Sequence, residues 1–208
     1  MSSFLSHLEW RRAVKAFDPK RTITESDLEK ILGAARMAPT SFGLQPFEVE
    51  IIQDKSLREK LKAQSWNQSQ VTDASVLLVF VVRTDIKKRI DEYFDNLSGG
   101  SAEARLKLKD YESMMRGMLE SRSEADLTAW AAKQAYISLG FAMAACAELE
   151  IDSCAMEGFA GPEFDKLLGF GPEKKSVVML PLGYRDQSIP LTPQFRFSEK
   201  DLFKRTNE

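Results

Sequence analysis

Histidine and cysteine are scarce in this chain, and their scarcity argues against several kinds of catalytic site. The 208 residues include one histidine, His7, and two cysteines, Cys146 and Cys154. A single histidine argues strongly against zinc catalysis and against any histidine-based triad. The cysteines have neither a metal-like spacing nor a Cys-x-x-Cys pattern, so we expect two free, buried thiols and no metal site.

A secretory signal and long apolar runs are also missing. The first ten residues, MSSFLSHLEW, contain no cationic segment followed by an apolar core. We therefore expect no export and a reducing, cytoplasmic setting. The apolar part of the longest uncharged stretch, residues 135–147, is too short to span a bilayer and is typical of a buried core helix. No membrane partner is expected.

Neither sign of charge dominates the composition. Lysine and arginine number 29 against 31 acidic residues, which gives a formal net charge of -2 and argues against general nucleic-acid binding. Hydrophobic residues at 43% and charged residues at 29% are ordinary values for a globular protein. No repeat, low-complexity tract or linker divides the chain, so we expect a single domain over residues 1–208.

Apolar periodicity predicts strands and helices that alternate irregularly along the chain. Strands are expected at 47–52, 74–82, 152–159 and 176–184, and helices within 22–39, 54–63, 124–149 and 162–169. Thr24 and Asp27 have the spacing of a capping pair at the start of one of these helices. The pattern predicts an α+β fold with a small sheet among helices.

Three segments do not fit a simple core pattern. Residues 85–123 are charged and only weakly periodic, which indicates an exposed helical excursion. The helix at 124–149 is apolar around nearly its whole circumference, so it needs cover on every side, and a partner subunit could supply part of that cover. The polar tail at 185–208 has no apolar core of its own and is expected to be extended.

Several short motifs are weak when each is taken alone. Arg11, Arg12 and Lys15 place three cations within five residues at the expected end of the first helix, where a solvated face is the ordinary explanation. APTSFGLQPF (38–47) alone is typical of a capped turn, and MEGF (156–159) of a strand end. Gln134 lies in a nearly all-apolar helix, where its amide needs a partner, although a satisfied core glutamine is the commoner case.

Taken together and in order, these motifs resemble one family, the FMN-dependent nitroreductases. The resemblance covers nearly the whole chain and rests on RRAVKAF, APTSFGLQPF, WNQSQVTDASVLLVF, WAAKQAY, MEGF, VVMLPLGY and Arg196. It implies an α+β nitroreductase-like fold with a small central mixed β-sheet surrounded by helices. It also implies a homodimer with the long buried helix at the dimer interface and non-covalent FMN between the subunits. The implied reaction is ping-pong: NAD(P)H gives a hydride to FMN N5, and a nitroaromatic, quinone or related electrophile then takes the electrons. FMN carries the chemistry, so no side chain is expected to be catalytic.

The resemblance assigns the cationic cluster to the cofactor. It implies that Arg11 and Arg12 approach the FMN phosphate or its ribityl chain and that Arg196 completes the phosphate site. Guanidinium groups suit this role because they stay charged and bind phosphate oxygens bidentately. Lys15 is expected at the pyrimidine edge of the flavin, where its charge favours the anionic reduced ring and tunes the cofactor.

Further positions are carried over from the family one by one. Thr40 and Ser41 match hydroxyl positions that contact the cofactor from the second subunit. Asn67 matches an amide that pairs with the flavin ring, and Gln134 one that reaches the ribityl chain. The segment Met156 to Gly158 is expected at the cofactor, with the backbone N–H groups of Glu157 and Gly158 on the N5 and O4 side.

The chain departs from the family pattern at four of the expected cofactor positions. Gly43 replaces a common asparagine, and Ala13 replaces a frequent serine. Gln70 and Gln194 each replace a common lysine, one facing the flavin and one at the phosphate. The two lost lysines weaken the positive charge of the site.

Two other functions remain open. The first is a specialised reductase of one metabolite, such as an enal or a semialdehyde, on the same scaffold. Residues 85–123, expected near the substrate mouth, would separate it from the broad reductase. The second is a non-catalytic dimer that stores or senses flavin.

Overall fold

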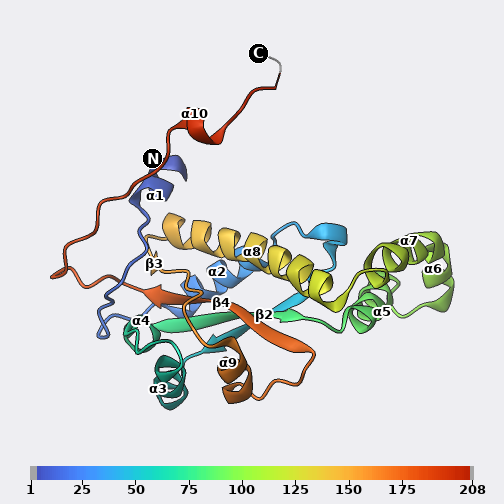
Figure 1. The fold of residues 1–208 in the computed structure, drawn as a ribbon, viewed down its shortest axis with the longest axis horizontal. Coiled ribbons are helices and arrows are strands. Elements are labelled where there is room, and N and C mark those ends of the chain that lie inside the picture. The colour runs from blue at the N-terminus through green and yellow to red at the C-terminus, as the bar shows by residue number, and fades with distance from the viewer. Residues whose placement is uncertain (1–3, 207–208) are drawn as a thin grey trace.

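The structure is a computed structural model, in which residues 4–206 are described. It contains a four-stranded sheet with helices on both faces (Figure 1). The strands are β1 (Phe47–Ile52), β2 (Val76–Arg83), β3 (Asp152–Ser153) and β4 (Lys174–Gly183). The helices are α1 (Phe4–Trp10), α2 (Glu25–Arg36), the 3-10 turn η1 (Ser41–Gly43), α3 (Lys55–Ala63), α4 (Gln70–Asp73), α5 (Ile86–Leu97), α6 (Ala102–Lys107), α7 (Lys109–Glu120), α8 (Glu124–Glu148), α9 (Gly161–Leu167) and α10 (Glu199–Leu202).

The sheet has the order β1-β2-β4-β3, and each neighbouring pair of strands is antiparallel. Within the described chain, the sheet is mixed through a single parallel bridge, between Ala13 and Ser153. Period-2 patterning reports which face a side chain occupies and carries no information on strand direction. Every residue of β2 is buried, as its continuous apolar run predicts.

The expected strand at 152–159 is much shorter than predicted. Two residues pair regularly as β3, and Met156 adds an isolated bridge to Met179. Between them, the Cys154 N–H donates to the Pro181 carbonyl at 3.3 Å, and Pro181 has no N–H with which to return a bond. The regular ladder is interrupted at this proline and resumes only at the Met156 bridge.

Helix ends follow the sequence closely. Thr24 accepts a hydrogen bond from the Asp27 N–H at the start of α2, which confirms the predicted capping pair. Gly169 follows α9 with φ +72°, the left-handed conformation that a glycine after a helix adopts without strain. The long helix α8 packs over the sheet on the same face as α2 (Figure 1), while α3 and α9 cover the opposite face.

Residues 85–123 form α5, α6 and α7, which extend beyond one end of the sheet (Figure 1). The helices are not wholly exposed, because Phe94 and Met115 are fully buried and join the main core. The charges of this segment pair with one another. Arg105 donates to Glu112 at 2.8 Å and, with Arg116, holds the pKa of that carboxyl down to about 2.

Neither cysteine is bonded to another, and both thiols are buried, as predicted. In the described part of the chain, no helix is long and apolar enough to cross a membrane.

Arg58 ties α3 to the start of β2 from a buried position. Its guanidinium donates to the carbonyls of Val71 at 2.6 Å and Ser75 at 3.2 Å, and also to that of Ala74. Arg58→Met is expected to lower the free energy of unfolding by about 2 kcal/mol, because buried carbonyls lose a charged donor. Urea denaturation measures this change. Lys55→Met, an exposed change on the same helix, should stay within about 0.5 kcal/mol of the wild type, and an equally small effect of Arg58→Met would contradict the assignment.

Candidate cofactor site

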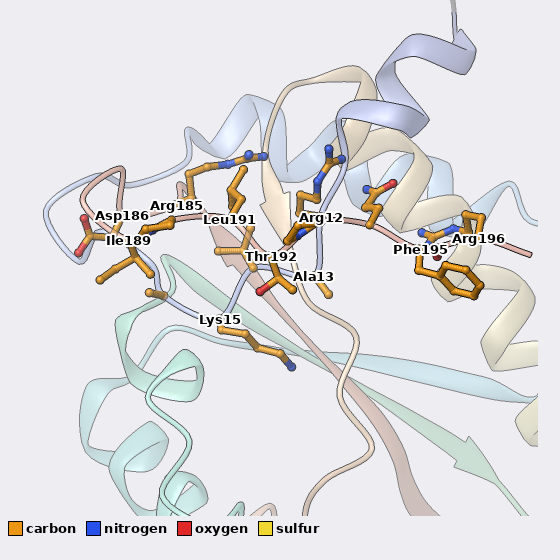
Figure 2. Close-up of a pocket in the computed structure, with 15 residues that line it drawn as sticks. Arg12, Ala13, Lys15, Arg185, Asp186, Ile189, Leu191, Thr192, Phe195 and Arg196 are labelled. Carbon is orange, nitrogen blue, oxygen red and sulfur yellow. Dashed lines mark hydrogen bonds between the residues drawn. The ribbon is translucent and has the colours of Figure 1, made fainter.

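The segment that follows α1 forms one wall of a cavity of about 400 Å³. It runs along the edge of the sheet beside β3, with the Ala13–Ser153 bridge near its start. The C-terminal tail forms the opposite wall, and Figure 2 shows Thr192 and Arg196 of the tail along the same cavity as Arg12 and Lys15. Segments nearly 200 residues apart in the sequence therefore bring three predicted site cations to one cavity of the size usual for small ligands.

The cations of this region repel one another. Burial lowers the pKa of Arg11, and the positive charges of Arg196 and Arg12 lower it further. Within residues 4–206, none of Arg11, Arg12, Lys15 and Arg196 forms an ion pair with a carboxylate. An anion among them would supply the missing opposite charge, so the donor set fits a phosphate group.

Individual contacts refine the predicted roles. Arg12 donates through Nη1 to the carbonyls of Trp10 at 3.0 Å and Arg11 at 3.1 Å, so it closes the C-terminal end of α1. Arg11 is not among the residues that line the cavity. Gln194, which replaces a common lysine, donates its amide to the Arg11 carbonyl and holds the tail against this segment.

Lys15 links the cationic segment to the strand end at 152–158. Its Nζ lies 3.6 Å from the Cys154 Sγ. Burial raises the pKa of Cys154, although the charges of Lys15 and Arg11 oppose this shift. Cys154 is therefore a neutral thiol, and the charge of Lys15 stays available to a ligand.

A second group of predicted residues lies on two loops that are bonded together. The Gln68 side chain donates to the Gly158 carbonyl at 3.0 Å, and the Ala160 N–H donates to the Gln64 carbonyl at 2.9 Å. These bonds bring Asn67 beside the segment 156–158. Gln70 is buried one turn further on, in α4.

The carboxylate of Glu157 accepts a hydrogen bond from the Tyr136 hydroxyl of α8. Burial and the charge of Glu157 raise the pKa of Tyr136 well above its ordinary value. Sequence reasoning did not single out Tyr136, which lies within the WAAKQAY motif.

A third group lies around η1. The Gln134 Oε1 accepts from the Ser41 N–H at 2.9 Å, and the Gln134 Nε2 donates to the Trp130 carbonyl at 3.1 Å. The amide that needed a partner thus finds two within the chain. Thr40 accepts from the Gln45 N–H at 3.2 Å. Gly43 has φ +67°, which glycine and asparagine adopt more easily than other residues, so the change from asparagine is compatible with this loop.

The Nitroreductase family model matches residues 8–184. The chain belongs to the nitroreductase family. A Staphylococcus epidermidis protein assigned as an NAD(P)H nitroreductase is 33% identical over 210 residues, which cover 96% of this chain and 95% of the relative. The resemblance inferred from the sequence motifs is confirmed.

Solved structures confirm the α+β nitroreductase fold. An Exiguobacterium sibiricum protein assigned as a nitroreductase, solved in complex with FMN, has a TM-score of 0.83 at 19% identity and covers 99% of this chain and 98% of its own. CLA-ER, an enone reductase of gut-bacterial fatty acid saturation metabolism, has a TM-score of 0.85 at 18% identity and covers 99% of both chains.

A single copy of this nitroreductase-family chain does not bring all the predicted site residues together. Burial raises the pKa of the Cys146 thiol, and Arg11 lies close enough for its positive charge to oppose this rise, whereas Gln134 and Ser41 lie toward the other end of α8. At 1.5 Å per residue, Cys146 and Gln134 are about 18 Å apart along the helix. The residues around η1 and the cationic cluster thus form two separate groups in one copy of the nitroreductase-family chain.

Proposed function

We propose that this chain is an NAD(P)H-dependent FMN oxidoreductase that binds FMN non-covalently between two copies of itself. The observation that carries the proposal is the cluster of cations at and beside the cavity between residues 12–16 and the tail, which has no carboxylate partner within the described residues 4–206. Arg11 and Arg196 would bind the FMN phosphate, while Arg12 would orient the segment by closing α1. Lys15 would hold a positive charge beside the flavin ring.

FMN, when bound, supplies the chemistry: its N5 takes a hydride from NAD(P)H, and the electrons pass to a second substrate in ping-pong order. Glu157 and Gly158 would direct backbone N–H groups to the flavin, and Asn67 would pair with its ring. The bonds between the loops at 64–68 and 156–160 fix these groups relative to each other. The chain provides position and electrostatics, and no side chain acts as a nucleophile.

A second copy would complete the site, because Thr40, Ser41 and Gly43 lie far from the cationic cluster of their own chain. α8 has an open groove that is almost wholly apolar, lined by Ile137, Phe141 and neighbouring small residues. An exposed apolar groove of this kind is typical of a subunit interface. Packing of two copies across α8 would bring the η1 residues of one copy toward the cations of the other.

We propose nitroaromatics, quinones and related electrophiles as the acceptors. A specialised reduction of a conjugated carbonyl compound is the second candidate, favoured by the fold shared with an enone reductase. A panel of acceptors assayed by NADPH oxidation separates them. Broad turnover supports the first candidate, and turnover confined to one enone or enal supports the second.

The test of the proposed function is the visible spectrum of the purified protein. We expect bound FMN that is bleached when NADH or NADPH is added without oxygen. Bound FMN that neither nicotinamide bleaches would indicate the flavin-storing or sensing alternative. A protein that binds no FMN would contradict the whole proposal.

Lys15→Met is expected to lower the midpoint potential of bound FMN by about 30–65 mV. The change removes an interaction with the reduced ring worth about 1.5–3 kcal/mol, and a two-electron couple shifts by about 30 mV per 1.4 kcal/mol. A dye-equilibrated redox titration measures the shift. Reduction by NAD(P)H should slow, whereas reoxidation by a good acceptor should not. Lys20→Met, an exposed change outside the cavity, should leave the potential unchanged, and an unshifted potential in flavin-loaded Lys15→Met would remove Lys15 from the site.

A further inference from the structure

Trp66 has a large apolar side chain that is exposed to solvent, and its backbone has an unfavourable conformation. It is 71% exposed, in the loop between α3 and α4. Its φ is +53°, and that of the next residue, Asn67, is +56°. Residues other than glycine seldom adopt this left-handed conformation, and two in succession are rarer still. Backbone strain of this kind gathers at functional sites, where the surrounding structure maintains it.

The neighbouring contacts maintain the conformation of Trp66. The Asn67 N–H donates to the Lys62 carbonyl at 3.1 Å, which closes the loop onto the end of α3. The Gln68 amide donates to the Gly158 carbonyl at 3.0 Å, so the loop is also fixed to the segment 156–160. On the N-terminal side of Trp66, the Ser65 N–H also donates to the Lys62 carbonyl at 3.0 Å. The backbone is therefore anchored on both sides of Trp66, and the exposure of this residue is not that of a free loop tip.

The indole rests on Gly158. A Cβ atom at residue 158 would lie 2.5 Å from a ring carbon of Trp66, so the ring occupies the space that any side chain there would need. Glycine at 158 thus permits the close approach of the indole to the backbone. The rest of the ring projects into solvent. Trp66 is not among the residues that line the α8 groove, so it does not belong to that apolar surface.

We propose that Trp66 is a stacking surface for the planar, electron-poor ring of an acceptor such as a nitroaromatic or a quinone. The inference rests on the proposed function, in which Asn67 and Gly158 lie against the flavin. Trp66 is exposed beside Asn67 and Gly158, so it then flanks the place where an acceptor must approach the cofactor. Indole faces are electron-rich and favour offset stacking on other rings. A nitroaromatic or quinone would gain from this contact, whereas an aliphatic enal would gain much less.

The test measures binding and turnover in the flavin-loaded dimer. The probe for binding is 4-cyanobenzoate, a planar electron-poor aromatic that serves as a ligand without being reduced. In equilibrium dialysis, Trp66→Ala should raise its Kd about 3- to 10-fold, the range for one aromatic contact. Trp66→Phe should stay close to wild type and Trp66→Leu should fall between, because leucine keeps apolar bulk without a ring.

The effect of Trp66→Ala on turnover should likewise depend on the acceptor. In Trp66→Ala, kcat/KM for 4-nitrobenzoate and 1,4-benzoquinone should fall about 3- to 10-fold. The values for ferricyanide and trans-2-hexenal, which have no planar conjugated ring, should be unchanged. The rate of flavin reduction by NADPH should also be unchanged. Phe203→Ala serves as the matched control, because Phe203 is an aromatic residue with the same 71% exposure outside both loops.

Several outcomes would overturn the assignment of Trp66. These are an unchanged Kd for 4-cyanobenzoate in Trp66→Ala, no binding of 4-cyanobenzoate to the wild type, an equal loss of affinity or turnover in Phe203→Ala, or a defect confined to flavin reduction by NADPH. A loss of FMN or of the dimer in Trp66→Ala would instead make it a cofactor or interface residue and would also overturn the proposal. Failure of the proposed function is distinct, because it is seen in the wild type as a protein without reducible FMN.

Discussion

Arg196→Ala should weaken FMN binding about 10- to 150-fold while leaving the FMN-free protein at least as stable as the wild type. The loss corresponds to about 1.5–3 kcal/mol, the usual range for a hydrogen bond to a charged group. The stability of the FMN-free protein should move the other way, because the charge of Arg196 opposes that of Arg11 and lowers its pKa. Removal of Arg196 relieves this repulsion.

Two measurements separate a binding role from a structural one. Fluorescence titration gives the Kd of FMN, and thermal unfolding of the flavin-free protein gives its Tm. Lys200→Ala, at an exposed cation of the same tail in α10, should change neither value. An unchanged Kd in Arg196→Ala would remove Arg196 from the site, and a lowered Tm without flavin would assign it to the fold instead.

Local elements of the fold could be predicted from the sequence because their causes are local. The strand at 47–52 has the predicted bounds, and α2 begins at the predicted Thr24 cap. The apolar α8 also ends within a residue of the prediction. Side-chain periodicity and capping depend on neighbours a few positions away, which the sequence displays directly.

Features that depend on distant partners were missed. One is the antiparallel pairing of the four strands. Another is the early end of β3, which is caused by Pro181 in the neighbouring strand β4. Both arise between segments far apart in sequence. The bond from Tyr136 to Glu157 and the anchoring of the tail by Gln194 have the same character. For the candidate site, the family motifs indicated which residues matter, but the position of each could come only from the three-dimensional arrangement.

Phe141→Glu is expected to dissociate the proposed dimer and to remove FMN with it. Phe141 is 41% exposed in the apolar groove of α8, beside Ile137. In a dimer packed across this groove, each copy would bury an unpaired carboxylate at a cost of several kcal/mol. The dimer Kd should therefore rise about 1,000-fold or more. The monomer should still fold, because the new charge stays in water when the groove is open.

Sedimentation over a range of protein concentrations and the visible spectrum test this expectation together. Phe141→Leu, which keeps the groove apolar, should remain a yellow dimer. Met118→Glu, a matched charge on the exposed side of α7 outside the groove, should also remain dimeric and retain FMN. Because Thr40 and Ser41 are expected to contact FMN from the opposite copy, loss of the dimer and loss of the flavin should occur at the same protein concentration. A folded Phe141→Glu monomer that retains FMN at wild-type affinity would show that one copy binds the cofactor alone, and the shared site would have to be abandoned.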